Sequence, residues 1–100
     1  MRIIARHTLT DFAAKHADAA ASLKNWEMIV RAASWKTTQD VQTAFSKAKV
    51  LNAERVRFEI SGGDYRLIVA IDFRRGIVFI KFIGTHAEYD RVDALTVSDY

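Results

Sequence analysis

The chain has 100 residues, of which 50% are apolar and 27% are charged, and its 15 Lys and Arg against 12 Asp and Glu leave a formal net charge of +3. This composition excludes a disordered tail, which combines low hydrophobicity with high net charge. Cysteine is absent, which excludes disulfides and thiolate metal sites. The sequence has no apolar run of about 18 residues, as a membrane span needs, and no export signal at its amino end. We therefore expect a single domain over residues 1–100, located in the cytoplasm.

Helical spacing of apolar residues characterises the first half of the chain, after a short strand predicted at Ile3 and Ile4. Steps of three and four predict a first helix on Leu9, Phe12, Ala13, Ala17 and Ala20. Thr8 and Asp11 resemble a capping box at its start. The same spacing predicts a second helix on Leu23, Trp26, Val30 and Ala33, and a short third helix from Thr38, with Asp40 in its first turn and Val41 and Phe45 four apart.

From residue 55 the apolar period becomes two, which indicates strands. Apolar Val56, Phe58 and Ile60 alternate with charged Arg55, Arg57 and Glu59. Turn signals at 61–64 and 74–76 separate further strands at 65–73 and 77–83, and residues 85–97 are expected to form a loop or a short helix. The predicted class is α+β, with two or three amino-terminal helices packed on a small antiparallel sheet.

The hairpin turns predict which polar residues meet. A four-residue loop at 61–64 pairs Ile60 with Tyr65 and sets Glu59 opposite Arg66. A three-residue loop at 74–76 pairs Phe73 with Ile77 and sets Arg66 opposite Gly84, whereas a two-residue loop sets it opposite Thr85. In both cases Arg66 lies beside the segment that carries His86. We therefore expect a cluster at one end of the sheet, made of Arg57, Glu59, Arg66 and His86.

This cluster has the groups needed to cleave an RNA phosphodiester. Arginine offers a forked, permanently charged donor for phosphate oxygens, and histidine exchanges a proton near neutral pH. Tyr89 can stack on a base or transfer a proton. Lys81 adds a point charge, on the same face only with the two-residue turn. A plainer interpretation of Arg66 opposite Glu59 is a cross-strand ion pair, and Tyr89 is equally able to pack its ring on the end of the sheet.

Two segments carry a resemblance to a known family. Residues 84–90, GTHAEYD, and residues 63–67, GDYRL, resemble the signature segments of HigB-type toxins, which are ribosome-dependent messenger-RNA endonucleases of the RelE-like superfamily. The resemblance covers most of the chain and is strongest from Arg55 to Ala94. The spacing of Trp26 and Trp35 supports it upstream.

The resemblance implies a small α+β toxin that cuts messenger RNA in the ribosomal A site and needs no cofactor or metal ion. A HigA-like helix-turn-helix antitoxin would neutralise it and supply any contact with DNA, and no membrane partner is expected. Arg66 would stabilise the scissile phosphate as a catalytic residue, together with His86 and Tyr89. The expected RNA-binding residues are Arg55, Arg57 and Lys81.

Two acidic residues depart from the family pattern. Glu59 stands where asparagine is expected, and Asp64 stands where a neutral residue is expected. Glu59 would either compete with RNA for Arg66 or serve as a general base. Two alternatives to the nuclease therefore stay open, namely a non-catalytic toxin that poisons a protein such as DNA gyrase, and an inactive relative that only binds an antitoxin.

Overall fold

The computed structural model describes residues 1–100 and contains one five-stranded sheet in the order β1-β5-β4-β3-β2. The strands are β1 Arg2–Ile4, β2 Lys49–Val50, β3 Arg55–Ile60, β4 Tyr65–Asp72 and β5 Ile77–Thr85. The helices are α1 His7–Lys15, α2 Ala20–Ala32, α3 Thr38–Ala44 and α4 His86–Tyr89, with 3₁₀ turns at Ala17–Ala19 and Ser61–Gly63. The predicted α+β class with helices on a small sheet is confirmed.

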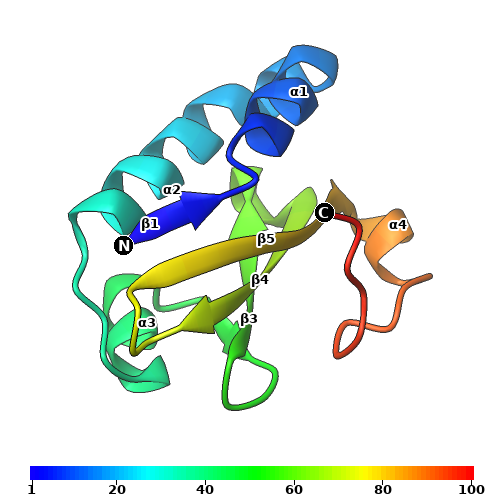
Figure 1. The fold of residues 1–100 in the computed structure, drawn as a ribbon. Helices are drawn as coiled ribbons and strands as arrows, with labels where there is room; N and C mark the ends of the chain where they lie inside the picture. The colour runs from blue at the N-terminus through cyan, green and yellow to red at the C-terminus, as the bar shows by residue number, and fades with distance from the viewer.

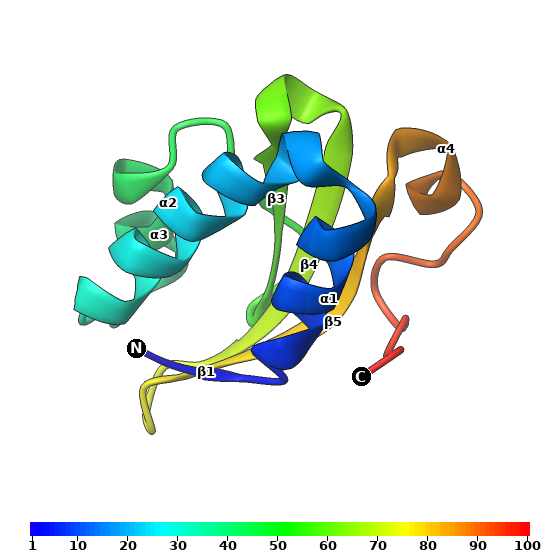
Figure 2. The ribbon, with the colours of Figure 1, turned by 90° about the horizontal axis from the view of Figure 1, so that it is seen from above.

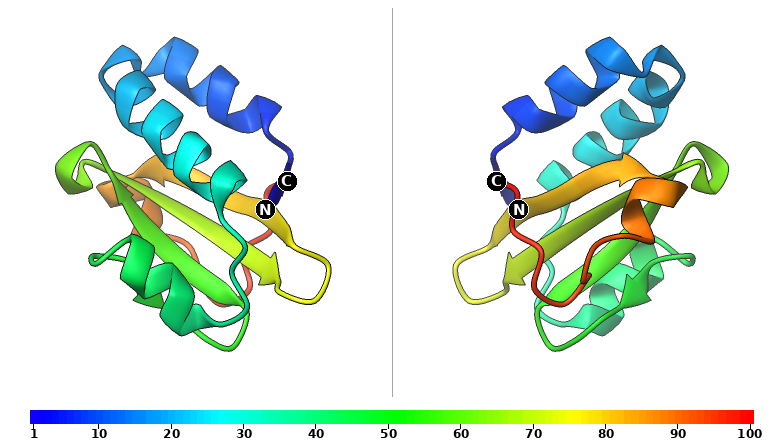
Figure 3. Two further views of the ribbon diagram at one scale, coloured as in Figure 1. Left: turned by 90° about the vertical axis from the view of Figure 1, so that its left-hand side faces the viewer. Right: turned by 90° about the vertical axis from the view of Figure 1, so that its right-hand side faces the viewer.

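The sheet separates two layers of unequal size (Figure 1). Helices α1, α2 and α3 cover one face, whereas α4 and the carboxy-terminal segment lie against the other (Figures 2 and 3). None of the helices is long and apolar enough to cross a membrane. We call the side of the sheet away from α1, α2 and α3 the open face.

The core lies between the sheet and the three covering helices. Strand β3 alternates buried Val56, Phe58 and Ile60 with half-buried charged residues, as its period of two predicts. Trp26 of α2 packs edge-on against Phe58, with 5.5 Å between ring centroids. Leu67 of β4 is fully buried in the same cluster. Removal of this apolar surface from water is the main stabilising contribution to the fold.

The register of β4 against β3 is as predicted. Ile60 pairs with Tyr65, and Glu59 lies opposite Arg66. The connecting turn needs left-handed backbone conformations, with φ of 69° at Gly62 and 101° at Gly63. Glycine adopts these conformations without a steric penalty, which is why the pair of glycines marks the turn.

The second hairpin differs from both predicted turns. Asp72, not Phe73, pairs with Ile77, so the loop has one residue more than the longer prediction. A β-bulge between Ile68 and Val69 then leaves Lys81 as an extra residue on β5. The longer loop and the bulge shift the register in opposite directions. Arg66 consequently lies opposite Gly84, as the three-residue turn also predicted.

Several local predictions are wrong. The sheet is mixed because β1 runs parallel to β5, and the two-residue strand β2 was not foreseen. The first helix ends at Lys15, since His16 leaves the helical conformation and stacks its ring on Phe12, with centroids 4.3 Å apart. The Thr8 hydroxyl donates to the Ala5 carbonyl and forms no capping box. By contrast, α3 begins as predicted, with a capping box between Thr37 and Asp40.

Replacing Leu67 with alanine tests the packing of the core. We expect Leu67→Ala to lower the free energy of unfolding by about 2–5 kcal/mol, because the side chain is fully buried and leaves a cavity. Leu95→Ala is the matched control, since Leu95 is 52% exposed and its truncation should cost less than about 0.5 kcal/mol. Urea denaturation of both variants measures the difference, and equal losses would contradict this assignment of the core.

Tyr65 gives the fold a dependence on alkaline pH. Its hydroxyl donates to Asp18 Oδ1 at 2.6 Å, and this hydrogen bond, with burial, raises the pKa of Tyr65 to about 12. A pKa raised in the folded state adds stability below the unfolded value of about 10, and that stability is lost as pH rises through the folded value. We expect the melting temperature of the wild type to fall more steeply above pH 10 than that of Tyr65→Phe. Parallel alkaline melting profiles would contradict the coupling.

Candidate functional site

The candidate site lies on the open face, where β3, β4 and α4 meet. The alternation that buries Val56 and Phe58 in the core turns Arg57 and Glu59 of β3 to this face. Arg66 of β4 pairs with Glu59 and therefore shares it. Gly84, opposite Arg66, is followed by the residues that form α4. The predicted convergence of this end of the sheet with α4 is thus found in the strand register.

Arg66 is held in place by two acceptors. Only 8% of the residue is exposed. Its Nη1 donates to the carbonyl of Gly63 at 2.9 Å and lies 3.3 Å from Glu59 Oε1. Its Nε is buried and has no hydrogen-bond partner. A buried donor without a partner costs desolvation free energy in the free protein.

The turn before β4 is built around this guanidinium. A Cβ atom on Gly63 would lie 3.1 Å from Arg66 Nη1 and 3.6 Å from Glu59 Oε1. The residue also has a positive φ, which disfavours any side chain. Glycine is therefore needed here both for the backbone conformation and for the close approach of Arg66.

Arg57 and Tyr89 form a second contact on the open face. The guanidinium carbon of Arg57 lies 5.7 Å from the centroid of the Tyr89 ring, within the range of a cation–π interaction. The same ring packs at 6.4 Å from that of Phe82. Arg57 Nε is buried without a hydrogen-bond partner. Tyr89 thus joins α4 to the sheet through Arg57 of β3 and Phe82 of β5.

A capping box fixes the start of α4. The Thr85 hydroxyl accepts from the backbone N–H of Glu88, and the Glu88 carboxylate accepts from the backbone N–H of Thr85 at 2.8 Å. These hydrogen bonds hold the pKa of Glu88 below its ordinary value. Gly84, just before α4, leaves no room for a side chain. A Cβ atom there would lie 2.7 Å from the Phe82 ring.

His86 is the first residue of α4 and is oriented by Asp90, a residue that the sequence analysis did not single out. Nδ1 of His86 lies 3.2 Å from Asp90 Oδ2, and both side chains are more than half exposed. A carboxylate only accepts, so the contact favours the tautomer with a proton on Nδ1 and leaves Nε2 free to exchange one. The spacing of four residues in a short helical segment is the signal that identifies this pair.

Two of the expected RNA-binding residues are separated from this group. Arg55 Nη1 donates to the carbonyls of Ala94 and Val97 at 3.1 and 2.8 Å. The bulged Lys81 contacts Ser98 Oγ at 3.4 Å, and its ammonium lies 5.6 Å from the Phe79 ring centroid. Both cations line a hollow of about 450 Å³ beside the carboxy-terminal segment. The structure thus places the predicted residues in three groups, namely Arg66 with Glu59, Arg57 with Tyr89 and the α4 segment, and the hollow lined by Arg55 and Lys81.

No group of three or more His, Asp or Glu side chains in the structure is placed to hold a metal ion. The charged groups of the site are Arg57, Arg66 with its paired Glu59, and the His86–Asp90 pair.

Comparisons with known proteins identify the family of this chain. The sequence model of a family described as the HigB toxin, a RelE-like toxic component of a toxin–antitoxin system, matches residues 19–92. A relative from Escherichia coli O6:H1, named mRNA interferase HigB, is 28% identical over 95 residues, which cover 92% of this chain and 91% of the relative. The match includes the strands and the α4 segment that carried the resemblance in the sequence. The chain belongs to the HigB toxin family of RelE-like toxins.

Proposed function

We propose that this toxin is an mRNA interferase, an endoribonuclease that inhibits translation by cutting messenger RNA on the ribosome. The name of the Escherichia coli relative supports the activity. The observation that carries the proposal is the position of Arg66, which Glu59 and the Gly63 carbonyl hold on the open face. We call Arg66 with these two partners the arginine centre. A preorganised guanidinium of this kind stabilises negative charge that develops on phosphate oxygens.

The proposed reaction is attack by the RNA 2′-hydroxyl on the adjacent phosphorus. The bond from the 2′-oxygen to phosphorus forms, and the bond from phosphorus to the 5′-oxygen of the next nucleotide breaks. One group removes the 2′-proton, and another protonates the 5′-oxygen as it leaves. The products are a 2′,3′-cyclic phosphate and a 5′-hydroxyl. Arg66 would stabilise the charge on the non-bridging oxygens, and no metal ion or cofactor takes part.

His86 is the proposed proton-transfer residue. Its Nδ1 faces Asp90, so Nε2 is the atom available to substrate, and the aspartate would stabilise the imidazolium as it forms. Exposure of the ring is compatible with this role, because a ribosome-bound message would close over it and exclude water.

The remaining predicted residues fit the path of an RNA strand across the open face. Tyr89 already contacts the Arg57 guanidinium. Its ring could stack on a base, and its hydroxyl could take part in proton transfer. Arg55 donates hydrogen bonds to the Ala94 and Val97 carbonyls through Nη1 alone, so its other N–H groups could bind a backbone phosphate. Lys81 would add a point charge to the same basic hollow.

The toxin–antitoxin family implies an antitoxin partner. We propose that this partner is a HigA-like helix-turn-helix protein, through which the complex contacts DNA, and that the toxin acts on ribosomes in the cytoplasm. We also propose that residues 1–100 act as one domain, since one buried cluster joins α1, α2 and α3 to β3, β4 and β5.

Alanine substitutions at the arginine centre and at α4 test the nuclease. Arg66→Ala should lower the cleavage rate about 100- to 1,000-fold through loss of charge stabilisation, and His86→Ala about 100- to 10,000-fold through loss of proton transfer. Primer extension on abundant messages after induced expression detects the cuts, and circular dichroism checks that each variant folds. Arg74→Ala, in an exposed turn, is the matched arginine control and should cut like the wild type.

The same experiment separates the alternatives. Growth arrest without new 5′ ends would point to a non-catalytic poison of a protein target such as DNA gyrase. A folded wild type that causes no arrest would point to an inactive relative that only binds its antitoxin. Either outcome would overturn the proposed nuclease.

Replacing Glu59 with glutamine tests its part in the reaction. We expect Glu59 to compete with the RNA phosphate for Arg66, so Glu59→Gln should lower KM about five-fold, equivalent to about 1 kcal/mol for a partly exposed ion pair, and leave kcat unchanged. Steady-state cleavage by the purified chain on programmed ribosomes gives both constants. A fall in kcat of more than about ten-fold would instead assign Glu59 as the general base.

A further inference from the structure

The carboxy-terminal segment folds back along the open face after α4 (Figures 1 and 3). We call residues 93–100 the strap. The Asp93 carbonyl accepts from the N–H groups of Thr96 and Val97 at 3.1 and 2.8 Å, and Asp93 Oδ1 accepts from the N–H of Leu95 at 3.0 Å. These hydrogen bonds form a turn at the start of the strap.

Two attachments hold the strap on the sheet. Arg55 Nη1 of β3 donates to the carbonyls of Ala94 and Val97 at 3.1 and 2.8 Å. The N–H of Asp99 donates to the carbonyl of Lys81 at 2.9 Å, and Lys81 is the bulged residue of β5, which has no pairing partner on β4. Because β4 lies between β3 and β5, the strap passes across β4 from one attachment to the other.

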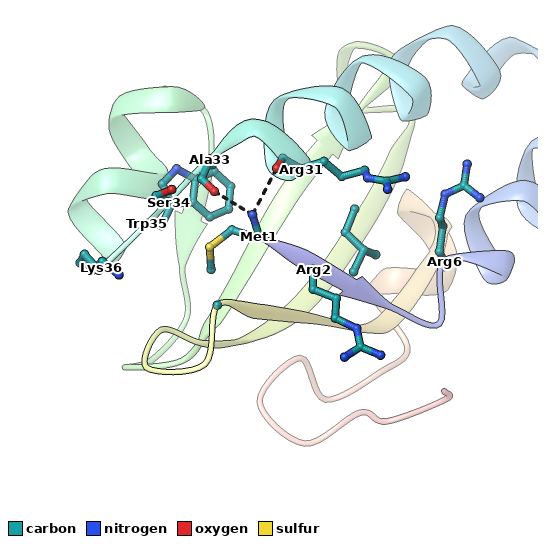
Figure 4. A pocket seen from close by; sticks show the side chains of 10 residues that line it. Met1, Arg2, Arg6, Arg31, Ala33, Ser34, Trp35 and Lys36 are labelled. Carbon is teal, nitrogen blue, oxygen red and sulfur yellow. Dashed lines mark hydrogen bonds between the residues drawn. The ribbon is translucent and has the colours of Figure 1, made fainter.

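Apart from these attachments, the strap packs loosely. None of its residues is buried, and it contains two of the three large apolar side chains that are exposed in the whole chain, Leu95 and Tyr100. The amino end is held differently, since Met1 packs against the core and its nitrogen donates to the carbonyls of Arg31 and Ala33 at 3.4 and 2.7 Å (Figure 4). A segment with few buried contacts opens at a small cost in free energy.

The strap brings carbonyl and carboxylate oxygens to a basic surface. Between residues 93 and 100 the sequence has two aspartates and no lysine or arginine. Leu95 of the strap borders the hollow of about 450 Å³ that Arg55 and Lys81 line. The peptide carbonyls bound by Arg55 are neutral, whereas a phosphate oxygen carries charge and forms a stronger hydrogen bond with a guanidinium. The strap is therefore a weak occupant of a position that suits a phosphate.

An RNA strand and the strap compete for Arg55. Arg55 pairs with Ala70, and Arg66 pairs with Glu59, so the two arginines are offset along the strands by four residues, roughly 13 Å at about 3.3 Å per residue. An RNA strand that runs from Arg66 to Arg55 would find Nη1 of Arg55 already bonded to the strap. A forked hydrogen bond to a phosphate needs two N–H groups of the guanidinium, so the strap in this position blocks it.

We propose that the strap is an autoinhibitory cover on the RNA path. In the closed state its carbonyls occupy Arg55 and its Asp99 N–H is bonded to the Lys81 carbonyl. RNA binds the state in which the strap has detached, and a phosphate takes the place of the strap carbonyls. The apparent affinity for RNA is therefore reduced by the fraction of molecules that are open. This inference rests on the proposed function.

A purely structural role is the competing interpretation of the strap. Ile68 and Phe82 are buried apolar residues outside the core cluster, and they pair with each other on the open face. However, the Tyr89 ring of α4 packs 6.4 Å from the Phe82 ring. Arg57, which lies opposite Ile68, contacts the same tyrosine. The cover of these apolar residues thus includes α4 and Arg57, which stay in place when the strap detaches.

The matched variants Asp99→Pro and Asp99→Ala test the cover. Proline has no backbone N–H and cannot bond to the Lys81 carbonyl, whereas alanine keeps the N–H and removes only the carboxylate. Fluorescence anisotropy measures binding of a short single-stranded RNA of 2′-O-methyl nucleotides, which the proposed reaction cannot cut, at about 50 mM salt. We expect Asp99→Pro to bind about five- to ten-fold more tightly than the wild type, and Asp99→Ala at most about two-fold more tightly.

Amide hydrogen exchange of the wild type, followed by NMR, gives a second measurement. The N–H of Asp99 should be protected in the free protein and lose its protection when RNA saturates the toxin. The N–H of Asp90, which donates to the His86 carbonyl at 3.1 Å within the α4 turn, is the internal control and should exchange at the same rate with and without RNA.

Equal affinities of the two variants, no RNA binding at all, or an Asp99 amide that stays protected with RNA would each overturn the proposal. A lower melting temperature of Asp99→Pro with unchanged RNA affinity would assign the strap a structural role instead. Because this RNA is not cut, the outcome is separate from the nuclease assay. New 5′ ends in cells together with a strap that stays closed would overturn the cover alone, whereas a strap that opens on RNA without any cleavage would overturn the nuclease alone.

Discussion

The register of β4 between β3 and β5 is the constraint on which the site depends. Side chains alternate between faces, so a shift of one residue would exchange Arg66 with the core residue Leu67. The apolar alternation of β3 and β4 fixes the register from one side, because any other pairing would expose core side chains. The turn glycines fix it from the hairpin end, and Gly63 at the same time makes room for the Arg66 guanidinium.

Once the register is set, charge determines what each surface can bind. Arg66 has a negative partner in Glu59, 3.3 Å from its Nη1, which in the proposed reaction would compete with the RNA phosphate.

Local rules predicted most of the fold, and non-local contacts account for the errors. The period of two predicted β3, the turn at 61–64 predicted its pairing with β4, and the spacing of Val41 and Phe45, with Asp40 in the first turn, predicted the start of α3. The early end of α1 depends on His16 stacking with Phe12 and lying 5.1 Å from Tyr65, a residue 49 positions later. No local spacing shows that β1 lies parallel to β5. The meeting of Arg66 with the α4 segment was predictable from hairpin geometry, although the bulge at Lys81 was not. Asp90 was missed because its partnership with His86 exists only when the segment becomes helical.

In the proposed reaction, the open face directs attack by the RNA 2′-hydroxyl. The most direct measurement uses a message with a single 2′-deoxy nucleotide on the 5′ side of a mapped cleavage position, presented on ribosomes to the wild-type toxin. The account predicts that this position is not cut, that neighbouring cuts persist and that their new 3′ ends carry cyclic phosphate. Cleavage at the substituted position, or 3′-hydroxyl ends throughout, would contradict it.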